Sequence, residues 1–329
     1  MLAQIEITAS DWAIFVVAIL IFLALDLGVF HRKAHVVGFR EAFAWTAIWF
    51  VVAICFGLFI APEFVEHWGK EEKAQFITGY IIELSLSMDN VFVIALIFTY
   101  FRVPSEYQHR VLFWGILGAL LMRGLLIGVG VALIDWLDWI LYVFGAFIVY
   151  TGVKMFFVDN DVDPEKNKII RLARKFFPIT PHFDGQKFRT EWNGAMALTP
   201  LALVLLMVET TDLLFAFDSI PAIFAVTRNP FIVFTSNVFA ILGLRSLYFV
   251  LAGAIEYFRY LKYGLAVVLV FIGVKMLIDP HDEDHHRWFQ VDIPILLSLL
   301  IVAGIIAISI LLSLIAAWRE KKNKNQPAK

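Results

Sequence analysis

The feature that most constrains this chain is its series of continuous apolar runs, each long enough for one helix across a lipid bilayer. A helix needs about 20 apolar residues to cross a hydrocarbon core of roughly 30 Å. A transmembrane β-barrel would instead show segments of about ten residues in which polar and apolar side chains alternate. We therefore predict an all-α, polytopic membrane protein with nine transmembrane helices. The runs lie near residues 11–30, 40–60, 75–100, 110–133, 138–158, 194–227, 231–254, 262–278 and 292–317.

Composition excludes several other classes of protein. Of the 329 residues, 60% are hydrophobic and 17% are charged, whereas soluble proteins average about 45–50% and 25%. The 32 Phe and 10 Trp residues are too many for one soluble core of this length, which excludes a soluble enzyme. The net charge of −2 provides no basic surface for nucleic acid. The single cysteine, Cys55, cannot form a disulfide within the chain.

The connections between the runs alternate in charge. Basic residues cluster after the first, third, fifth, seventh and ninth runs, and the other connections are acid-rich. One acid-rich connection is the stretch His281–His286, which we interpret as a solvated loop. Since basic loops lie on the cytoplasmic side of a membrane, we expect the N-terminus outside and the C-terminus inside. Residues 159–193 then form a cytoplasmic loop, in which we predict a short amphipathic helix near 168–177.

The sixth apolar run is too long for a simple span. Residues 194–227 would form a straight helix of about 51 Å, against a hydrocarbon core of roughly 30 Å. The run also contains Pro200 and Pro221, and a proline inside a helix removes a hydrogen-bond donor. We therefore expect this helix to be tilted, kinked or locally unwound.

Polar residues recur in the same order in two parts of the chain. The segments Glu83–Asn90 and Asp212–Ser219 each hold an acid, five further residues, an aspartate and a small polar residue. Arg123 and Arg245 follow in the next helices, and a Gly-Val-Lys-Met sequence ends each copy, at residues 152–155 and 273–276. Four ordered polar matches of this kind indicate an internal repeat.

Each copy of this repeat holds three helices, so the second copy must enter the membrane from the opposite side. Inverted repeats are typical of transporters, in which paired helices meet near the midplane and form the site. The predicted parts are 1–74 with two helices, 75–158 as the first repeat, 159–193 as the loop, 194–279 as the second repeat, and 280–329 with the last helix and a basic tail.

Acidic side chains within the apolar runs are the best candidates for function. A carboxylate at mid-membrane costs a few kcal/mol and marks a functional site by default. We interpret Arg123 and Arg245 as structural counter-charges, which leaves an excess of three negative charges. A divalent cation or protonation would offset that excess, whereas the alternative is a buried network that only joins the two halves. The five acids are Glu83, Asp89, Glu209, Asp212 and Asp218.

The chemistry of the candidate ligands favours a hard divalent cation. Carboxylate, amide and hydroxyl oxygens suit Mg²⁺, Ca²⁺ or Mn²⁺, and the two acid-bearing runs contain no Cys or His, which argues against Zn²⁺ or Cu²⁺. The chain also lacks HExxH, GxGD and GxSxG motifs, so we expect no enzyme and no permanently bound cofactor. The predicted metal-binding residues are Glu83, Asp89, Asn90, Glu209, Asp212, Asp218 and Ser219.

The same motifs resemble those of the TerC/Alx family of bacterial integral membrane proteins over nearly the whole chain. The resemblance rests on Glu-x-x-Leu-x-x-Asp-Asn-Val-Phe-Val at 83–93, on the acidic run 209–226, and on 231–237, 240–245 and 273–276. It implies the bacterial inner membrane, export of Mn²⁺ or its supply to enzymes outside the cytoplasm, and a functional role for the seven predicted residues.

Two hypotheses for function follow. The first is a divalent-cation exporter, with Mn²⁺ as the transported ion and alternating access at a midplane carboxylate site. Because a membrane potential opposes cation exit by about 2.3 kcal/mol per charge per 100 mV, proton exchange is the favoured coupling. The alternative is an accessory protein that assists insertion or metal loading of exported proteins, with other membrane proteins as partners and residues 159–193 as the contact.

Overall fold

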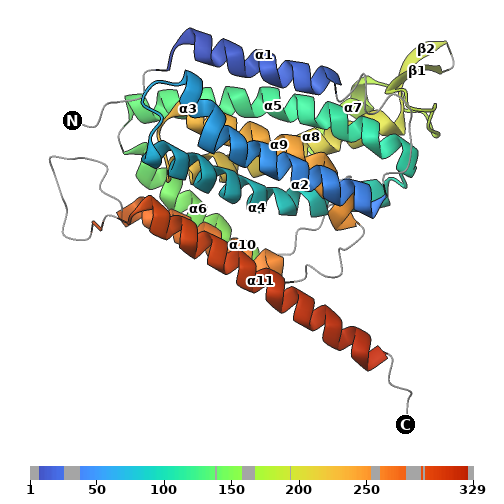
Figure 1. The fold of residues 1–329 in the computed structure, drawn as a ribbon. Helices are drawn as coiled ribbons and strands as arrows, with labels where there is room; N and C mark the ends of the chain where they lie inside the picture. Colours follow the sequence, from blue (N-terminus) through green and yellow to red (C-terminus); the bar gives the residue numbers. More distant parts are fainter. Residues whose placement is uncertain are drawn as a thin grey trace.

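The fold was analysed in a computed structural model that describes residues 7–25, 38–137, 139–157, 167–192, 194–252, 260–278, 290–291 and 293–324. The chain is nearly all helical, as predicted, and its helices form one bundle with similar axes (Figure 1). Within the described ranges, eight helices are long and apolar enough to cross a membrane. Helix α1 (Ala9–Leu25) is a shorter apolar helix in the place of the first predicted span. The histidines of 281–286 lie outside the described residues.

The remaining elements follow the predicted spans closely. Helix α2 passes through a π-helical turn at Phe56–Ile60 directly into α3. Helix α9 begins where the Asn229 side chain accepts a hydrogen bond from the Phe231 amide at 2.9 Å. The elements are α2 (Phe39–Cys55), α3 (Ala61–Phe64), α4 (Lys70–Tyr100), α5 (Ser105–Trp136), α6 (Ile140–Phe157), α7 (Lys168–Phe176), β1 (Arg189–Trp192), β2 (Ala195–Leu198), α8 (Pro200–Phe224), α9 (Pro230–Ala252), α10 (Leu261–Ile278) and α11 (Ile295–Lys324).

The sixth predicted span begins too early, because its first residues form a strand. Strand β2 pairs antiparallel with β1, and the turn between them uses Gly194 at a φ of 78°, where glycine is favoured. Helix α8 therefore starts at Pro200, where proline is well tolerated, and spans about 38 Å. It stays helical past Pro221, so of the three expected distortions (tilt, kink or local unwinding) the unwinding is not seen. The predicted short helix near 168–177 is confirmed as α7.

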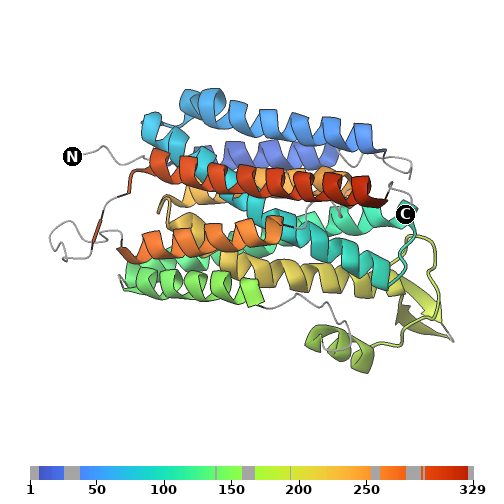
Figure 2. The same cartoon turned by 90° about the horizontal axis from the view of Figure 1, so that it is seen from below.

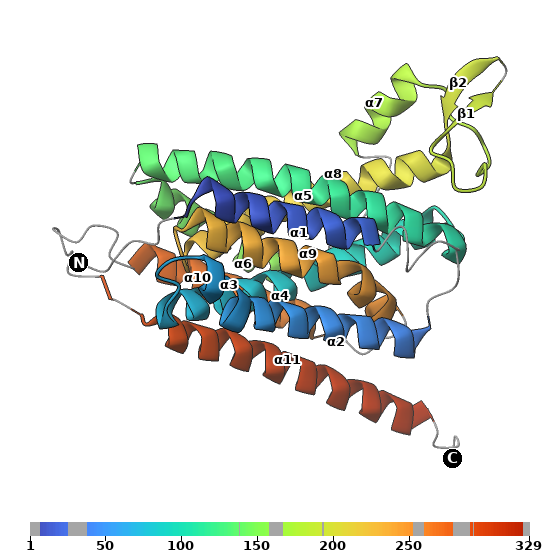
Figure 3. The same cartoon turned by 45° about the horizontal axis from the view of Figure 1, so that its top comes forward.

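The hairpin and α7 form a small cap at one end of the bundle, which we call the α7 end (Figures 2 and 3). Asn167 caps α7 by accepting a hydrogen bond from the Ile169 amide at 2.9 Å. Before β1, the Asp184 carboxylate accepts hydrogen bonds from Thr190 at 2.7 Å and from Lys187 at 3.0 Å. These two contacts hold the pKa of Asp184 below its usual range.

Helices α4 and α9 form the interior, and α2 and α11 lie outside them. Helix α9 is the most buried of the long apolar helices and α4 the next, whereas α11 exposes apolar side chains such as Leu300 along its length. Figure 1 shows α1 along one side of the bundle and α11 along the other. The outer helices therefore present the apolar surface that a bilayer would cover.

Helices α6 and α10 pack closely through glycines. A Cβ atom on Gly145 would lie 3.1 Å from the Gly273 carbonyl oxygen, and one on Gly152 would lie 3.0 Å from the Ala266 carbonyl oxygen. In the predicted repeat, residues 145 and 152 of the first copy correspond to 266 and 273 of the second. Exchanging the two copies therefore turns the contact between 145 and 273 into the contact between 152 and 266. Helix α4 likewise packs on α9 as α8 packs on α5. A two-fold relation between inverted repeats would account for this reciprocity.

We expect Gly273→Ala to weaken the α6–α10 contact. The added methyl group would lie 2.8 Å from both the Gly145 carbonyl oxygen and the Val149 amide nitrogen, and forcing backbones apart costs about 1–3 kcal/mol. The matched control is Gly128→Ala on α5, where nothing lies within 4 Å. Thermal unfolding in detergent should show a lower Tm for the first variant alone, and equal Tm values would contradict the close packing.

Candidate functional site

Arg123 links the two predicted repeats inside the bundle. It lies near the middle of α5, and its side chain is only 2% exposed. Its Nη1 atom donates to Glu83 on α4, while Nη2 and Nε donate to the two carboxylate oxygens of Asp212 on α8, at 2.9 and 3.2 Å. The planar guanidinium matches a carboxylate in this two-pronged manner. One arginine therefore pairs with the corresponding acids of both repeats.

Neutral polar groups complete the cluster around Arg123. Its Nη1 atom lies 3.4 Å from both the Ser219 hydroxyl oxygen and the Asn237 Oδ1 atom. The Asn90 side chain donates to Asp212 Oδ1 at 3.2 Å. Asn237, on α9, was not among the predicted site residues. Asn237 ends the motif 231–237 noted in the sequence, but as an uncharged amide within an apolar run it was not counted as a site residue.

The cluster is buried but not fully paired. Glu83 is completely buried, and its second oxygen, Oε2, has no hydrogen-bond partner among the described residues. The same holds for Oδ1 of Asn90 and Nδ2 of Asn237. A buried polar atom without a partner is costly, and oxygen atoms of this kind are suitable ligands for a hard cation. The cluster thus retains capacity for a further ligand.

A cavity of about 590 Å³, here called the first cavity, connects this cluster with the α7 end of the bundle. Its lining includes Glu83 and Arg123 at one extreme and Asn167, the N-cap of α7, at the other. Asp89 and Asp218 also line it. Because α4 is continuous at Asp89, this residue joins the site through a cavity shared by several helices, without helix distortion.

Two side chains of α6 face the acids in the first cavity. Thr151 and Lys154 line the cavity and are the polar neighbours of Asp218. Lys154 is exposed near the helix end, as expected for a long cationic side chain that reaches water. The cavity therefore combines carboxylate, amide and hydroxyl oxygens with two cations, Arg123 and Lys154.

The structure does not gather every predicted residue. Glu209 packs on α5, where its carboxylate occupies the space that a side chain at Gly118 would need. Neither Glu209 nor the half-buried Arg245 is among the described residues that line the first cavity. Among the residues that the structure describes, no group of three His, Cys, Asp or Glu side chains lies close enough together to hold a metal ion. The residues brought together are Glu83, Asp89, Asn90, Asp212, Asp218 and Ser219, with Arg123 among them.

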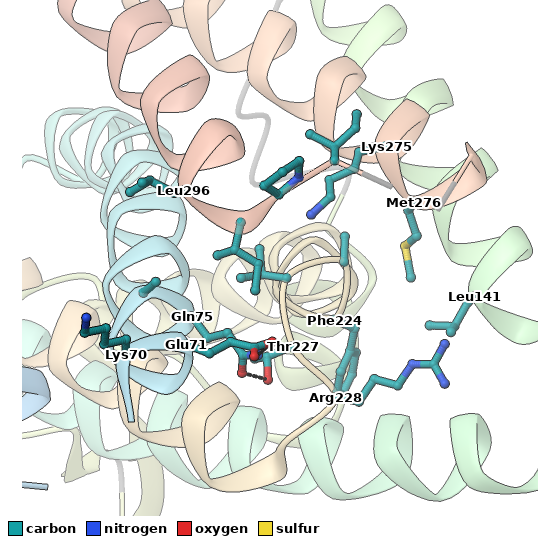
Figure 4. A pocket seen from close by; sticks show the side chains of 16 residues that line it. Lys70, Glu71, Gln75, Leu141, Phe224, Thr227, Arg228, Lys275, Met276 and Leu296 are labelled. Atoms are coloured by element: carbon teal, nitrogen blue, oxygen red, sulfur yellow. Dashed lines mark hydrogen bonds between the residues drawn. The ribbon is translucent and has the colours of Figure 1, made fainter. Parts of the chain in front are cut away.

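A second cavity, of about 860 Å³, lies at the opposite end of the bundle (Figure 4). The start of α4 and the end of α8 form part of its wall, and there Thr227 donates to the Gln75 side chain at 2.6 Å. Lys275 and Met276 of α10 also line it. The Lys275 side chain is only 4% exposed, whereas the corresponding Lys154 reaches the surface near the end of its helix.

The two cavities are related through the predicted repeat, and apolar side chains separate them. Lys154 and Met155 line the first cavity, and the corresponding residues of the second repeat, 275 and 276, line the second. Between the cavities, α4 contributes Ile82 and α8 contributes Ile220 and Ile223, which are buried in one apolar cluster. The charged cluster therefore connects with a cavity toward the α7 end and is closed toward the other.

Comparison with known proteins places this chain in a family. A family model described as the integral membrane protein TerC family matches residues 68–323. The chain belongs to the TerC family. It is 54% identical to an uncharacterized membrane protein of Myxococcus xanthus, STKORF319, over 92% of both chains. No solved structure matches.

Other TerC family relatives are similar over almost their whole length. An Escherichia coli K12 protein, named as a candidate membrane-bound redox modulator, Alx, is 44% identical over 95% of this chain and 97% of its own. An uncharacterized membrane protein of Rickettsia felis is 41% identical over 93% of this chain and 97% of its own. The match confirms the family resemblance that the acidic motifs indicated.

Replacing Arg123 tests the electrostatic role of the cluster. Arg123→Ala should destabilise the protein by about 3–5 kcal/mol, because it leaves the carboxylates of Glu83 and Asp212 buried without a counter-charge. Adding Asp212→Asn to that variant should restore part of the loss, and Lys154→Ala, at an exposed cation, serves as the control. Thermal unfolding in detergent measures the effect, and a neutral Arg123→Ala variant would contradict the assigned ion pairs.

Proposed function

We propose that this TerC family protein exports a divalent cation across the bacterial inner membrane, with Mn²⁺ as its cargo. The observation that carries the proposal is the first cavity, which leads from the α7 end to a buried cluster of oxygen ligands and ends there. A second cavity begins on the far side of the Ile82, Ile220 and Ile223 cluster. Two cavities that flank one closed barrier are what alternating access requires.

The charge of the first cavity suits one divalent cation. Its lining residues and their direct partners include four acids, Glu83, Asp89, Asp212 and Asp218, against the two cations Arg123 and Lys154. With these six ionised, the sum is −2, and Lys262 at the start of α10 acts on Asp89 from outside the cavity. The available oxygen ligands are those that hard divalent cations prefer, so a single such ion would neutralise the cavity.

Arg123 has a defined role in this proposal. Its guanidinium occupies the position between Glu83 and Asp212, where it neutralises both carboxylates while the cavity holds no cargo. A cation that reaches Asp89, Asn90 and Asp218 adds positive charge beside the guanidinium, which weakens its hold on the pair. The ion pairs of Arg123 with Glu83 and Asp212, which hold the helices together on the closed side of the site, are then weakened.

The proposed direction follows from the distribution of basic residues. Basic loops lie on the cytoplasmic side, which makes the α7 end cytoplasmic and the first cavity an entrance from the cytoplasm. Because the membrane potential opposes cation exit, counter-flow of protons through the same carboxylates is the proposed driving force. Lysines and arginines at the α7 end include Arg40, Arg102, Arg110, Arg171, Arg174, Lys175, Lys187, Arg189, Lys262 and Arg319, against Lys70, Lys73, Arg228 and Lys275 at the other end.

The name of the Escherichia coli relative refers to redox modulation, which is compatible with export. This chain has a single cysteine, Cys55, so it cannot cycle between a dithiol and a disulfide of its own. Movement of a redox-active metal ion is one route by which such a protein can influence redox balance. The alternative, an accessory protein for insertion or metal loading, predicts protein partners and no ion flux through the pure protein.

Transport by the purified protein in liposomes tests the proposal. Wild-type protein should move Mn²⁺ and, in exchange, shift the pH of the lumen, whereas Asp89→Asn and Asp218→Asn should each reduce the flux at least tenfold, because each removes a charge from the first cavity. Glu191→Gln, on the hairpin outside the spans, is the matched carboxylate control. Flux that persists in both aspartate variants would remove these residues from the mechanism, and a wild type without flux would favour the accessory role.

The separation of the two cavities can be tested with thiol labelling. In a Cys55→Ala background, Thr211→Cys reports the first cavity and Ala74→Cys reports the second. Imposed Mn²⁺ and pH gradients should change their reactivity toward a membrane-impermeant reagent in opposite directions. Ile223→Cys, within the barrier, should stay unreactive in the closed state. Parallel changes at both reporters would contradict alternating access.

A further inference from the structure

The cap at the α7 end contains an apolar groove that the transport proposal does not use. Its volume is about 520 Å³. Helix α7 forms one wall with Ile169, Leu172 and Phe176, and Trp114 of α5 belongs to another. Helix α8 and the hairpin region, including Leu205 and Arg189, form further parts of the lining. Figures 2 and 3 show α7 beside the bundle at this end, next to α8.

The spacing of residues on α7 directs its apolar face into the groove. Residues 169, 172, 173 and 176 follow the i, i+3, i+4, i+7 pattern of one helix face, and all four line the groove. Even so, Leu172 remains 55% exposed and Phe176 67% exposed. Ile170, on another face, is 1% exposed and holds α7 against the bundle. Helix α7 is therefore held to the bundle by Ile170, while the apolar face that lines the groove remains partly exposed.

The groove lies where two spans approach the edge of the bilayer. Trp114 is nine residues into α5, or about 14 Å, and Leu205 is five residues into α8, or about 8 Å. Trp114 is 44% exposed, and tryptophan is typical of the interface between lipid and water. The lining of the groove is thus continuous with the lipid-facing surface of the bundle.

The described part of the cap is basic. Residues 167–192 contain six Lys or Arg and two Asp or Glu, which gives a net charge of +4. Arg189 lines the groove, and Arg174 and Lys175 are exposed on the side of α7 turned away from its groove-lining face. Lys187, by contrast, is paired with Asp184 at 3.0 Å. An amphipathic helix with this combination of faces lies at a membrane interface and attracts anionic lipid.

We propose that this groove binds an anionic phospholipid of the surrounding bilayer. The apolar lining formed by Leu172, Phe176 and Trp114 takes an acyl chain, and Arg189 holds the phosphate of the headgroup, while Arg174 and Lys175 add to the positive potential around it. A lipid fits better than a soluble anion because apolar side chains form most of the lining, and better than a docked protein because the groove opens on the lipid-facing surface. This site is independent of the proposed transport function.

Lipid binding to the full-length protein tests the proposal. Phosphatidylglycerol added to the detergent-purified protein should bind at least tenfold more tightly than phosphatidylcholine, measured by native mass spectrometry and by the shift in Tm. The triple variant Arg174→Gln, Lys175→Gln and Arg189→Gln should lose this preference, because each basic residue contributes separately to the attraction. Lys187→Gln, whose charge is already paired, is the matched control and should keep it.

A second variant tests the apolar part of the site. Ala173→Trp should fill the groove and displace both lipids, while its Tm in lipid-free detergent stays near that of the wild type. Equal affinity for the two lipids in the wild type would overturn the proposal. So would an equal effect of glycerophosphoglycerol, which lacks acyl chains, because it would show a simple anion site. A groove that binds no lipid but retains a co-purified protein would overturn it as well.

Discussion

The rest of the structure depends on the burial of Arg123 between two carboxylates. A charge in the interior of a membrane protein is tolerated only with partners, and this guanidinium takes its partners from α4, α8 and α9 while it is itself carried by α5. Those contacts determine how four central helices face one another. Because a guanidinium has five donors in a rigid plane, its two acids cannot move apart without leaving a buried charge unpaired.

The same interaction makes the two similar halves of the chain unequal. Arg123 lies in the cluster, whereas the matching Arg245 is outside the first cavity, although Glu83 and Asp212 occupy corresponding positions. The α6–α10 contacts are reciprocal, but of the two cavities lined by described residues, the one at the α7 end reaches the cluster and the other does not. Two related halves in different arrangements fit the proposed transport by alternating access.

The sequence predicted the parts of this fold that depend on local pattern. An almost entirely helical chain with long apolar spans, the short helix α7 and the pairing of an intramembrane arginine with acids all follow from hydropathy or from isolated charges, and the described residues show each of them. What it could not predict depends on contacts between distant segments. Residues 195–198 are apolar enough for a span, and only their pairing with β1 makes them a strand. Glu209 carries the same charge as Asp212, but its place on the helix turns it toward Gly118. Asn237 belongs to the cluster around Arg123, and Lys275 to the second cavity, only because of the way the helices pack.

The most direct test of the central claim is Mn²⁺ binding to the purified protein, followed by electron paramagnetic resonance as the signal of free Mn²⁺ is lost. The account predicts about one bound Mn²⁺ per chain, loss of that binding in the Asp89→Asn, Asp218→Asn double variant, and wild-type affinity in Glu209→Gln, whose carboxylate faces α5. Unchanged binding in the double variant, or loss of binding in Glu209→Gln alone, would show that the first cavity is not the cation site.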